Sequence, residues 1–121
     1  VTFVPGYDAG VIQQVTDGAQ MTDALYLKMI ASPNRDYTKF AADYAAVAAE
    51  INSIVLKEEV RPKGKQILQI AQILQEHFLK YEADHRARGR LTSGELQVYN
   101  DYLKAFWKPL LVAEMSLNKK K

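Results

Sequence analysis

The chain has 121 residues, a formal net charge of +2 and no cysteine, and 48% of its residues are hydrophobic. This length fits one domain, and the composition is typical of a globular protein rather than a disordered one. The lack of cysteine excludes disulfides, thiolate catalysis, and cysteine-ligated zinc or iron–sulfur centres.

The N-terminal residues 1–7 are predicted to be an extended lead-in, because they contain a Pro-Gly turn signal. A first helix is expected from Asp8 onward, where core-type residues recur at three- and four-residue steps. Gly18 costs a helix about 1 kcal/mol relative to alanine, so we expect a bend or break there. Pro33 ends the helix. The predicted seam residues are Ile12, Val15, Ala19, Thr22, Tyr26 and Met29.

A second helix is predicted over about residues 36–60 and a third over about residues 65–88, with Pro62-Lys63-Gly64 between them. Gly89 supplies the left-handed residue that commonly ends a helix. The predicted seam of the second helix is Tyr37, Phe40, Tyr44, Val47, Ile51 and Ile54, and that of the third is Ile67, Ala71, Leu74, Phe78, Tyr81 and His85.

A fourth helix has the clearest start, because Thr92 and Glu95 form a capping-box pattern. Leu91 and Leu96 occupy the two positions of a hydrophobic staple. Pro109 removes the backbone donor to the carbonyl four residues earlier, and it is predicted to kink this helix. The predicted seam is Leu96, Tyr99, Leu103, Phe106, Leu110, Ala113 and Leu117.

Four apolar stripes with three short connections predict an all-α fold, an antiparallel four-helix bundle with up-down-up-down topology. The single domain is predicted to cover residues 8–117, followed by a basic tail at residues 118–121. No run of eighteen apolar residues is present, so no segment is expected to span a membrane.

Glu82 and His85 are the strongest metal-ligand candidates, because their E-x-x-H spacing places both on one helix face. A di-iron bundle needs a second such motif and two further glutamates, and His77 has no matching glutamate. We therefore expect no metal, no haem and no other cofactor, and interpret His85 as a solvated side chain favoured by the helix dipole. The acidic residues of the second helix, Glu58 among them, are interpreted as lying on its solvent-exposed face. No nucleophile–base arrangement stands out, and we expect no enzymatic activity.

Basic residues gather at two connections. Arg61 begins one cluster, and Arg86, Arg88 and Arg90 form the other. In the predicted topology these clusters lie at opposite ends of the bundle, which argues against nucleic-acid binding along one continuous track. The three arginines are candidates for contact with an acidic partner or with lipid headgroups. The alternative is that they complement helix dipoles and keep the protein soluble.

Several tyrosines fall on or beside the predicted seams, and four of them are candidates for ligand binding: Tyr26, Tyr44, Tyr81 and Tyr99. A buried phenol needs a hydrogen-bond partner, and leaving it unpaired costs about 1–3 kcal/mol. These tyrosines therefore indicate one of three arrangements: a polar network in the core, hydroxyls that reach solvent at the edge of the core, or a cleft for a flat ligand.

The leading hypothesis is a non-catalytic helical interaction domain that docks another protein through its surface or end loops. The alternative is a small-molecule carrier or sensor that binds in the tyrosine-lined interior. The chain starts at Val1, which we interpret as removal of an export signal, with trimming of an expressed protein as the alternative. An exported, periplasmic or cell-surface location is expected, and a cytoplasmic location, a lipid anchor and homo-oligomers stay open.

Overall fold

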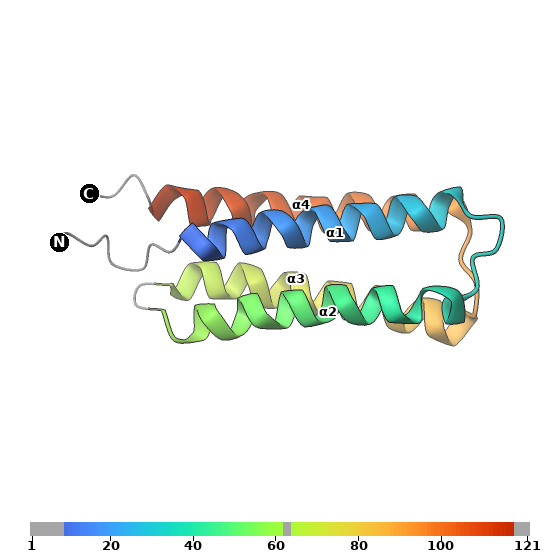
Figure 1. Ribbon diagram of the computed structural model, residues 1–121, viewed down its shortest axis with the longest axis horizontal. Coiled ribbons are helices and arrows are strands. Elements are labelled where there is room, and N and C mark those ends of the chain that lie inside the picture. Colours follow the sequence, from blue (N-terminus) through green and yellow to red (C-terminus); the bar gives the residue numbers. More distant parts are fainter. Residues whose placement is uncertain (1–8, 62–63, 118–121) are drawn as a thin grey trace.

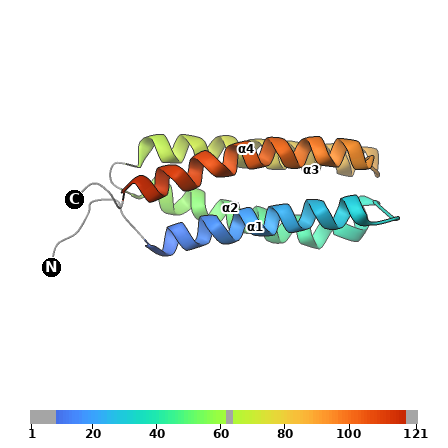
Figure 2. The same cartoon turned by 90° about the horizontal axis from the view of Figure 1, so that it is seen from above.

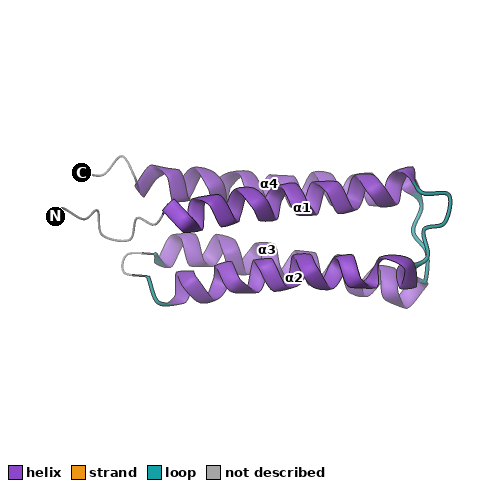
Figure 3. Cartoon of the chain, viewed as in Figure 1, coloured by secondary structure: helices purple, strands orange, loops and turns teal. Residues whose placement is uncertain are grey.

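The computed structural model describes residues 9–61 and 64–117, and within these ranges the chain forms four α-helices. They are α1 (Ala9–Ala31), α2 (Tyr37–Glu59), α3 (Lys65–Arg88) and α4 (Ser93–Leu117). Each helix packs against two neighbours, in the pairs α1–α2, α2–α3, α3–α4 and α1–α4. The predicted antiparallel up-down-up-down bundle is confirmed (Figure 1). The described part of the chain contains no strand, only one isolated bridge between Asp36 and Arg90 (Figure 3).

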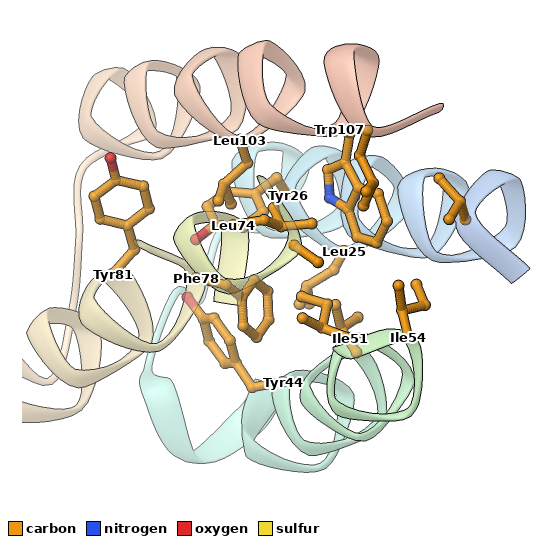
Figure 4. Packing of buried hydrophobic residues seen from close by; sticks show 14 of the residues in the cluster. Leu25, Tyr26, Tyr44, Ile51, Ile54, Leu74, Phe78, Tyr81, Leu103 and Trp107 are labelled. Carbon is orange, nitrogen blue, oxygen red and sulfur yellow. The ribbon is translucent and has the colours of Figure 1, made fainter. Parts of the chain in front are cut away.

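The buried positions follow a heptad spacing, in which steps of three and four residues alternate, with one additional buried residue in each of α1, α2 and α3: Tyr26, Val55 and Glu82. This spacing produces the knobs-into-holes packing of left-handed helical bundles. Side chains from all four helices meet in the core, among them the fully buried Tyr26, Tyr44, Phe78 and Leu103 (Figure 4). In α4 the buried positions are Leu96, Asn100, Leu103, Trp107, Leu110, Glu114 and Leu117.

The seam predicted for α3 is confirmed at every position, whereas the seam predicted for α4 is wrong at three of its seven. Tyr99, Phe106 and Ala113 are only partly buried, and the residue after each of them occupies the core instead. Two of these core residues are Asn100 and Glu114. The prediction chose the apolar neighbour because polar residues are rarely fully buried.

The first helix continues through Gly18, so the predicted break does not occur. The glycine is buried against the indole of Trp107, and a β-carbon at this position would lie 2.5 Å from the Cη2 atom of that ring. Such a distance is far inside van der Waals contact. Gly18 is therefore a packing residue, which allows α1 and α4 to approach with a tryptophan between them.

The helix ends follow the local rules that the sequence indicates. The Thr92 backbone N–H donates to Glu95 Oε1 at 3.0 Å, and the Glu95 N–H donates to Thr92 Oγ1 at 3.1 Å, which confirms the capping box. Gly89 has a φ of 80° and ends α3 as predicted. Pro109 lies inside α4, and Figure 2 shows the C-terminal part of this helix at an angle to the turns before it.

Two predicted segments, the lead-in at residues 1–7 and the basic tail at residues 118–121, lie outside the described residues. In the part that is described, no helix combines the length and the apolarity needed to cross a lipid bilayer.

Candidate functional site

His85 is fully buried, which corrects its interpretation as a solvated side chain. Its Nε2 atom lies 2.7 Å from the Arg35 carbonyl oxygen, and its Nδ1 atom lies 2.9 Å from the Tyr44 hydroxyl. Because a carbonyl only accepts, Nε2 donates, and in a neutral ring Nδ1 accepts from Tyr44. Burial raises the pKa of the Tyr44 hydroxyl. His85 thus ties α3 to α2 and to the first connection. Its place on the predicted seam of the third helix is confirmed, and only its interpretation as solvated is wrong.

Glu82, the other candidate metal ligand, is engaged separately from His85. Its Oε2 atom accepts from the Tyr37 hydroxyl at 2.8 Å and from Arg86 Nη2 at 3.3 Å. Among the described residues, no three histidine, aspartate or glutamate side chains are grouped closely enough to hold a metal ion. The arrangement is suited to joining α2 and α3.

The four candidate tyrosines lie in two separate pairs. Tyr26 and Tyr44 are in the core, with their rings edge to face and 6.4 Å between centroids. Tyr81 and Tyr99 stack at 4.1 Å on the side of the bundle formed by α3 and α4, and Tyr99 donates to Asp84 at 2.7 Å. This bond to a carboxylate raises the pKa of Tyr99 to about 12. The structure does not bring the four into one cleft, and ligand binding by them stays a prediction.

Arg86, Arg88 and Arg90 lie at one end of the bundle, as predicted, and each pairs with a carboxylate of the same chain. Arg88 binds Glu95, and this hydrogen bond, together with the Thr92 N–H, lowers the pKa of Glu95 to about 2. The carboxylate partners are Glu82 for Arg86, Glu95 and Asp84 for Arg88, and Asp36 for Arg90. An acidic partner would have to compete with these carboxylates, so contact with such a partner stays a prediction.

At the opposite end, Arg61 lies between two buried glutamates. Its Nη1 atom is 3.1 Å from Glu58 Oε1 and also contacts Glu114. Both carboxylates are almost fully buried, so the interpretation of Glu58 as part of a solvent-exposed face is wrong. The heptad spacing could have indicated this, because Glu58 and Glu114 continue the buried seams of α2 and α4.

The outer face of α4 carries a second seam, which the sequence analysis missed. It consists of Val98, Tyr102, Ala105, Pro109 and Val112, all of them exposed, and we call it the outer seam. Val98, Tyr102 and Val112 keep 45%, 54% and 66% of their surface accessible. The steps between successive members are four, three, four and three residues, the same as in the buried seams. The outer seam contains no charged residue.

Aromatic rings extend this uncharged surface toward α3. The Phe106 ring lies 4.5 Å from that of His77, and the Tyr81 ring lies 6.5 Å from that of Tyr102 and stacks on that of Tyr99. We call these residues, His77, Tyr81, Tyr99 and Phe106, the aromatic shelf. The shelf and the outer seam are neighbours on α3 and α4, joined by the contact between the Tyr81 and Tyr102 rings.

Comparisons with protein-family models, with curated proteins and with solved structures find no match to this chain. Functional proposals therefore rest on the residues and their geometry alone.

Proposed function

We propose that this protein is a non-catalytic interaction domain that docks an amphipathic helix of another protein on the outer seam and the aromatic shelf. The observation that carries the proposal is the outer seam itself, a heptad-spaced and uncharged stripe whose five residues are all exposed in the described part of the chain.

The spacing of the outer seam favours a helical partner. Knobs-into-holes packing needs apolar residues at alternating three- and four-residue steps on both helices, and the outer seam supplies one side of such an interface. The seam runs from Val98 to Val112, about 21 Å at a rise of 1.5 Å per residue. A partner helix of about four turns would cover it, with the aromatic shelf against its flank.

The residue types of the outer seam also support a partner. Valine is a poorer helix former than alanine, and proline inside a helix is the poorest of all. Val98, Val112 and Pro109 therefore weaken α4 locally and, being exposed, bury little in return. A bound helix would bury their surface at about 25 cal/mol per Å² and would give these residues a favourable role.

The non-catalytic part of the proposal is supported by the two histidines, the natural general bases of the chain. His85 is buried with both ring nitrogens engaged. His77 directs Nδ1 to the Ile73 carbonyl oxygen at 2.9 Å and packs on Phe106. Both side chains serve as structural links, and the hydrogen bonds given above join neither ring to a serine or threonine hydroxyl.

The experiment is a capture from an extract of the cells that make the protein. The double variant Val98→Glu/Val112→Glu places two charges in the outer seam, and the matched control Ala42→Glu/Ala49→Glu places two on the exposed face of α2. We expect the wild type and the control to retain the same partner and the outer-seam variant to lose it. Retention of one set of proteins by all three, or of further copies of this chain only, would contradict the proposal.

A further inference from the structure

An open groove lies between α1 and α2, and a contact near one end shows which residues of the two helices face each other. Gln14 Nε2 donates to Ser53 Oγ at 2.9 Å, and the two helices are antiparallel neighbours (Figure 1). Both helices rise 1.5 Å per residue, so residues counted forward from Gln14 lie across from residues counted back from Ser53. Further along the same edge, Lys28 Nζ pairs with Asp43 Oδ2 at 3.1 Å.

Two carboxylates face each other across this groove. Asp17 comes three residues after Gln14, and Glu50 comes three residues before Ser53. The two side chains therefore lie at the same level of the bundle, and both line one hollow of the groove. Two like charges at this place repel each other, and a cation between them would be attracted by both.

Both carboxylates are accessible to a ligand. Asp17 is exposed, and its Oδ1 atom accepts one hydrogen bond, from Gln13 Nε2 at 2.9 Å. Glu50 is half-buried. Neither carboxylate forms an ion pair with another described residue. Lys57, on the same edge, donates to Gln14 Oε1 at 2.8 Å. The level of Asp17 and Glu50 therefore carries two negative charges without a paired cation.

The groove continues from the carboxylates over an apolar floor. A second hollow of about 270 Å³ adjoins the first and shares Met21 and Ala24 with it. The ion pair of Lys28 and Asp43 lies at its far end. This hollow holds an aliphatic chain or a small ring, and it is smaller than the roughly 300–1,000 Å³ of drug-sized sites. The other apolar residues that line it are Leu25, Ala46 and Val47.

We propose that this groove binds a small amphiphilic amine, with its ammonium group between Asp17 and Glu50 and its apolar body over Met21 and Ala24. A bare inorganic cation would leave the apolar hollow empty, and a neutral apolar molecule would leave the two carboxylates uncompensated. The two halves of the groove together therefore select a ligand that has both a positive charge and an apolar body. The groove belongs to α1 and α2, whereas the proposed docking face belongs to α3 and α4, so the two proposals are independent.

The experiment uses protein labelled with ¹³C at the methyl groups of its three methionines. Met21 lines the groove and Met29 is fully buried, whereas Met115 is 49% exposed on α4 and reports non-specific contact. The probes are hexylamine, hexanol and methylamine at neutral pH and low ionic strength. Hexanol keeps the apolar body without the charge, and methylamine keeps the charge without the apolar body.

We expect hexylamine to shift the Met21 signal saturably. It should bind about five-fold more tightly than hexanol and about ten-fold more tightly than methylamine, because each of these loses one half of the interaction. Asp17→Asn/Glu50→Gln should weaken the binding of hexylamine about five-fold. The matched control Glu76→Gln/Asp101→Asn also removes two negative charges, from exposed positions on α3 and α4, and should bind hexylamine as the wild type does.

Equal affinity for hexylamine and hexanol would overturn the proposal, and so would equal affinity for hexylamine and methylamine. The proposal also fails if the Met21 signal does not move, or if Met21 and Met115 shift in parallel, which would show non-specific contact. If Asp17→Asn/Glu50→Gln does not fold, the comparison of the three probes on wild-type protein decides the question without it.

Discussion

The outer faces of α2 and α4 occupy equivalent places in the bundle, yet they differ in the residues that they present. On α2 the exposed uncharged positions are largely alanine: Ala42, Ala45, Ala46 and Ala49, with Leu56 two turns further on. On α4 they are the valines, the tyrosine and the proline of the outer seam. The alanines of α2 and the outer seam of α4 are both uncharged, although the exposed Asp101 and Lys108 lie beside the outer seam.

The difference in residue type shows which of the two uncharged surfaces cannot be explained by helix propensity. Alanine is the best helix former, so an alanine-rich outer face stabilises α2 without any partner. Valine, tyrosine and proline are worse in this respect, and the outer seam therefore has no local structural cause. The helix that carries the outer seam also buries Asn100 and Glu114 inside, so α4 departs from ordinary amphipathic patterning on both faces.

The largest effect is expected where α2 and α4 each bury a glutamate against Arg61. Arg61→Leu leaves two carboxylates in the interior without this cation, and we expect it to lower the free energy of unfolding by about 3–5 kcal/mol. Urea unfolding at neutral pH measures the change. Arg61→Lys, which keeps the charge, should lose clearly less. A loss below about 1 kcal/mol for the leucine variant would show that the buried cluster is not a single electrostatic unit.

The next largest effect concerns Pro109, which has no counterpart in α2. Pro109→Ala restores a backbone donor for the carbonyl of Ala105, and we expect it to stabilise the protein by up to about 3 kcal/mol. Thermal unfolding measures the gain. If the docking face depends on the bend of α4, the same variant should bind its partner less well. Unchanged or lower stability would mean that the bend relieves strain elsewhere in the core.

Exchanging residue types between the two faces tests the propensity argument directly. Val98→Ala and Val112→Ala should each raise the free energy of unfolding by about 0.5 kcal/mol, and Ala42→Val and Ala49→Val should each lower it by a similar amount. Chemical denaturation of the four single variants gives the comparison. Destabilisation by the alanine variants on α4 would mean that these valines contribute to folding of the monomer.

The smallest effect concerns the start of α4. The pKa of Glu95 is lowered to about 2, below the value near 4.3 of an unfolded chain. Its ionised form therefore stabilises the folded state above about pH 4.3, and this contribution is lost as the pH falls toward 2. Glu95→Gln should be less stable than the wild type at pH 6, and the gap should close on acidification. A gap that is independent of pH would contradict this. The N-cap of α2, Asp36, makes no side-chain cap bond and offers a contrast.

The fold could be predicted from the sequence because it depends on the spacing of apolar residues and on short motifs at the helix ends. The seam of α3, the glycine at its end and the capping box of α4 depend on residue type and spacing alone. Asn100, Glu114 and Glu58 escaped prediction because a single polar residue on a seam looks like a boundary residue, and only the strict heptad count places it inside. The role of Gly18 needs the position of Trp107, 89 residues later in the chain.

The candidate sites were harder to predict, because they depend on which helix faces remain exposed to solvent once the four helices have packed together. The outer seam has the spacing of a core stripe, and the sequence alone does not say which of two stripes on α4 faces the other helices. The tyrosines were identified individually, but their division into two pairs follows from the order of the helices around the core.

The most direct test of the docking face is site-specific photo-crosslinking in the cells that make the protein. A benzophenone side chain would replace Tyr102 in the outer seam or, as the matched control, Leu56 on α2, two side chains that are 54% and 55% exposed. The account predicts one abundant adduct with another polypeptide from position 102, lost when Val112→Glu is added, and none from position 56. Equal adducts from both positions, or none from position 102, would contradict it.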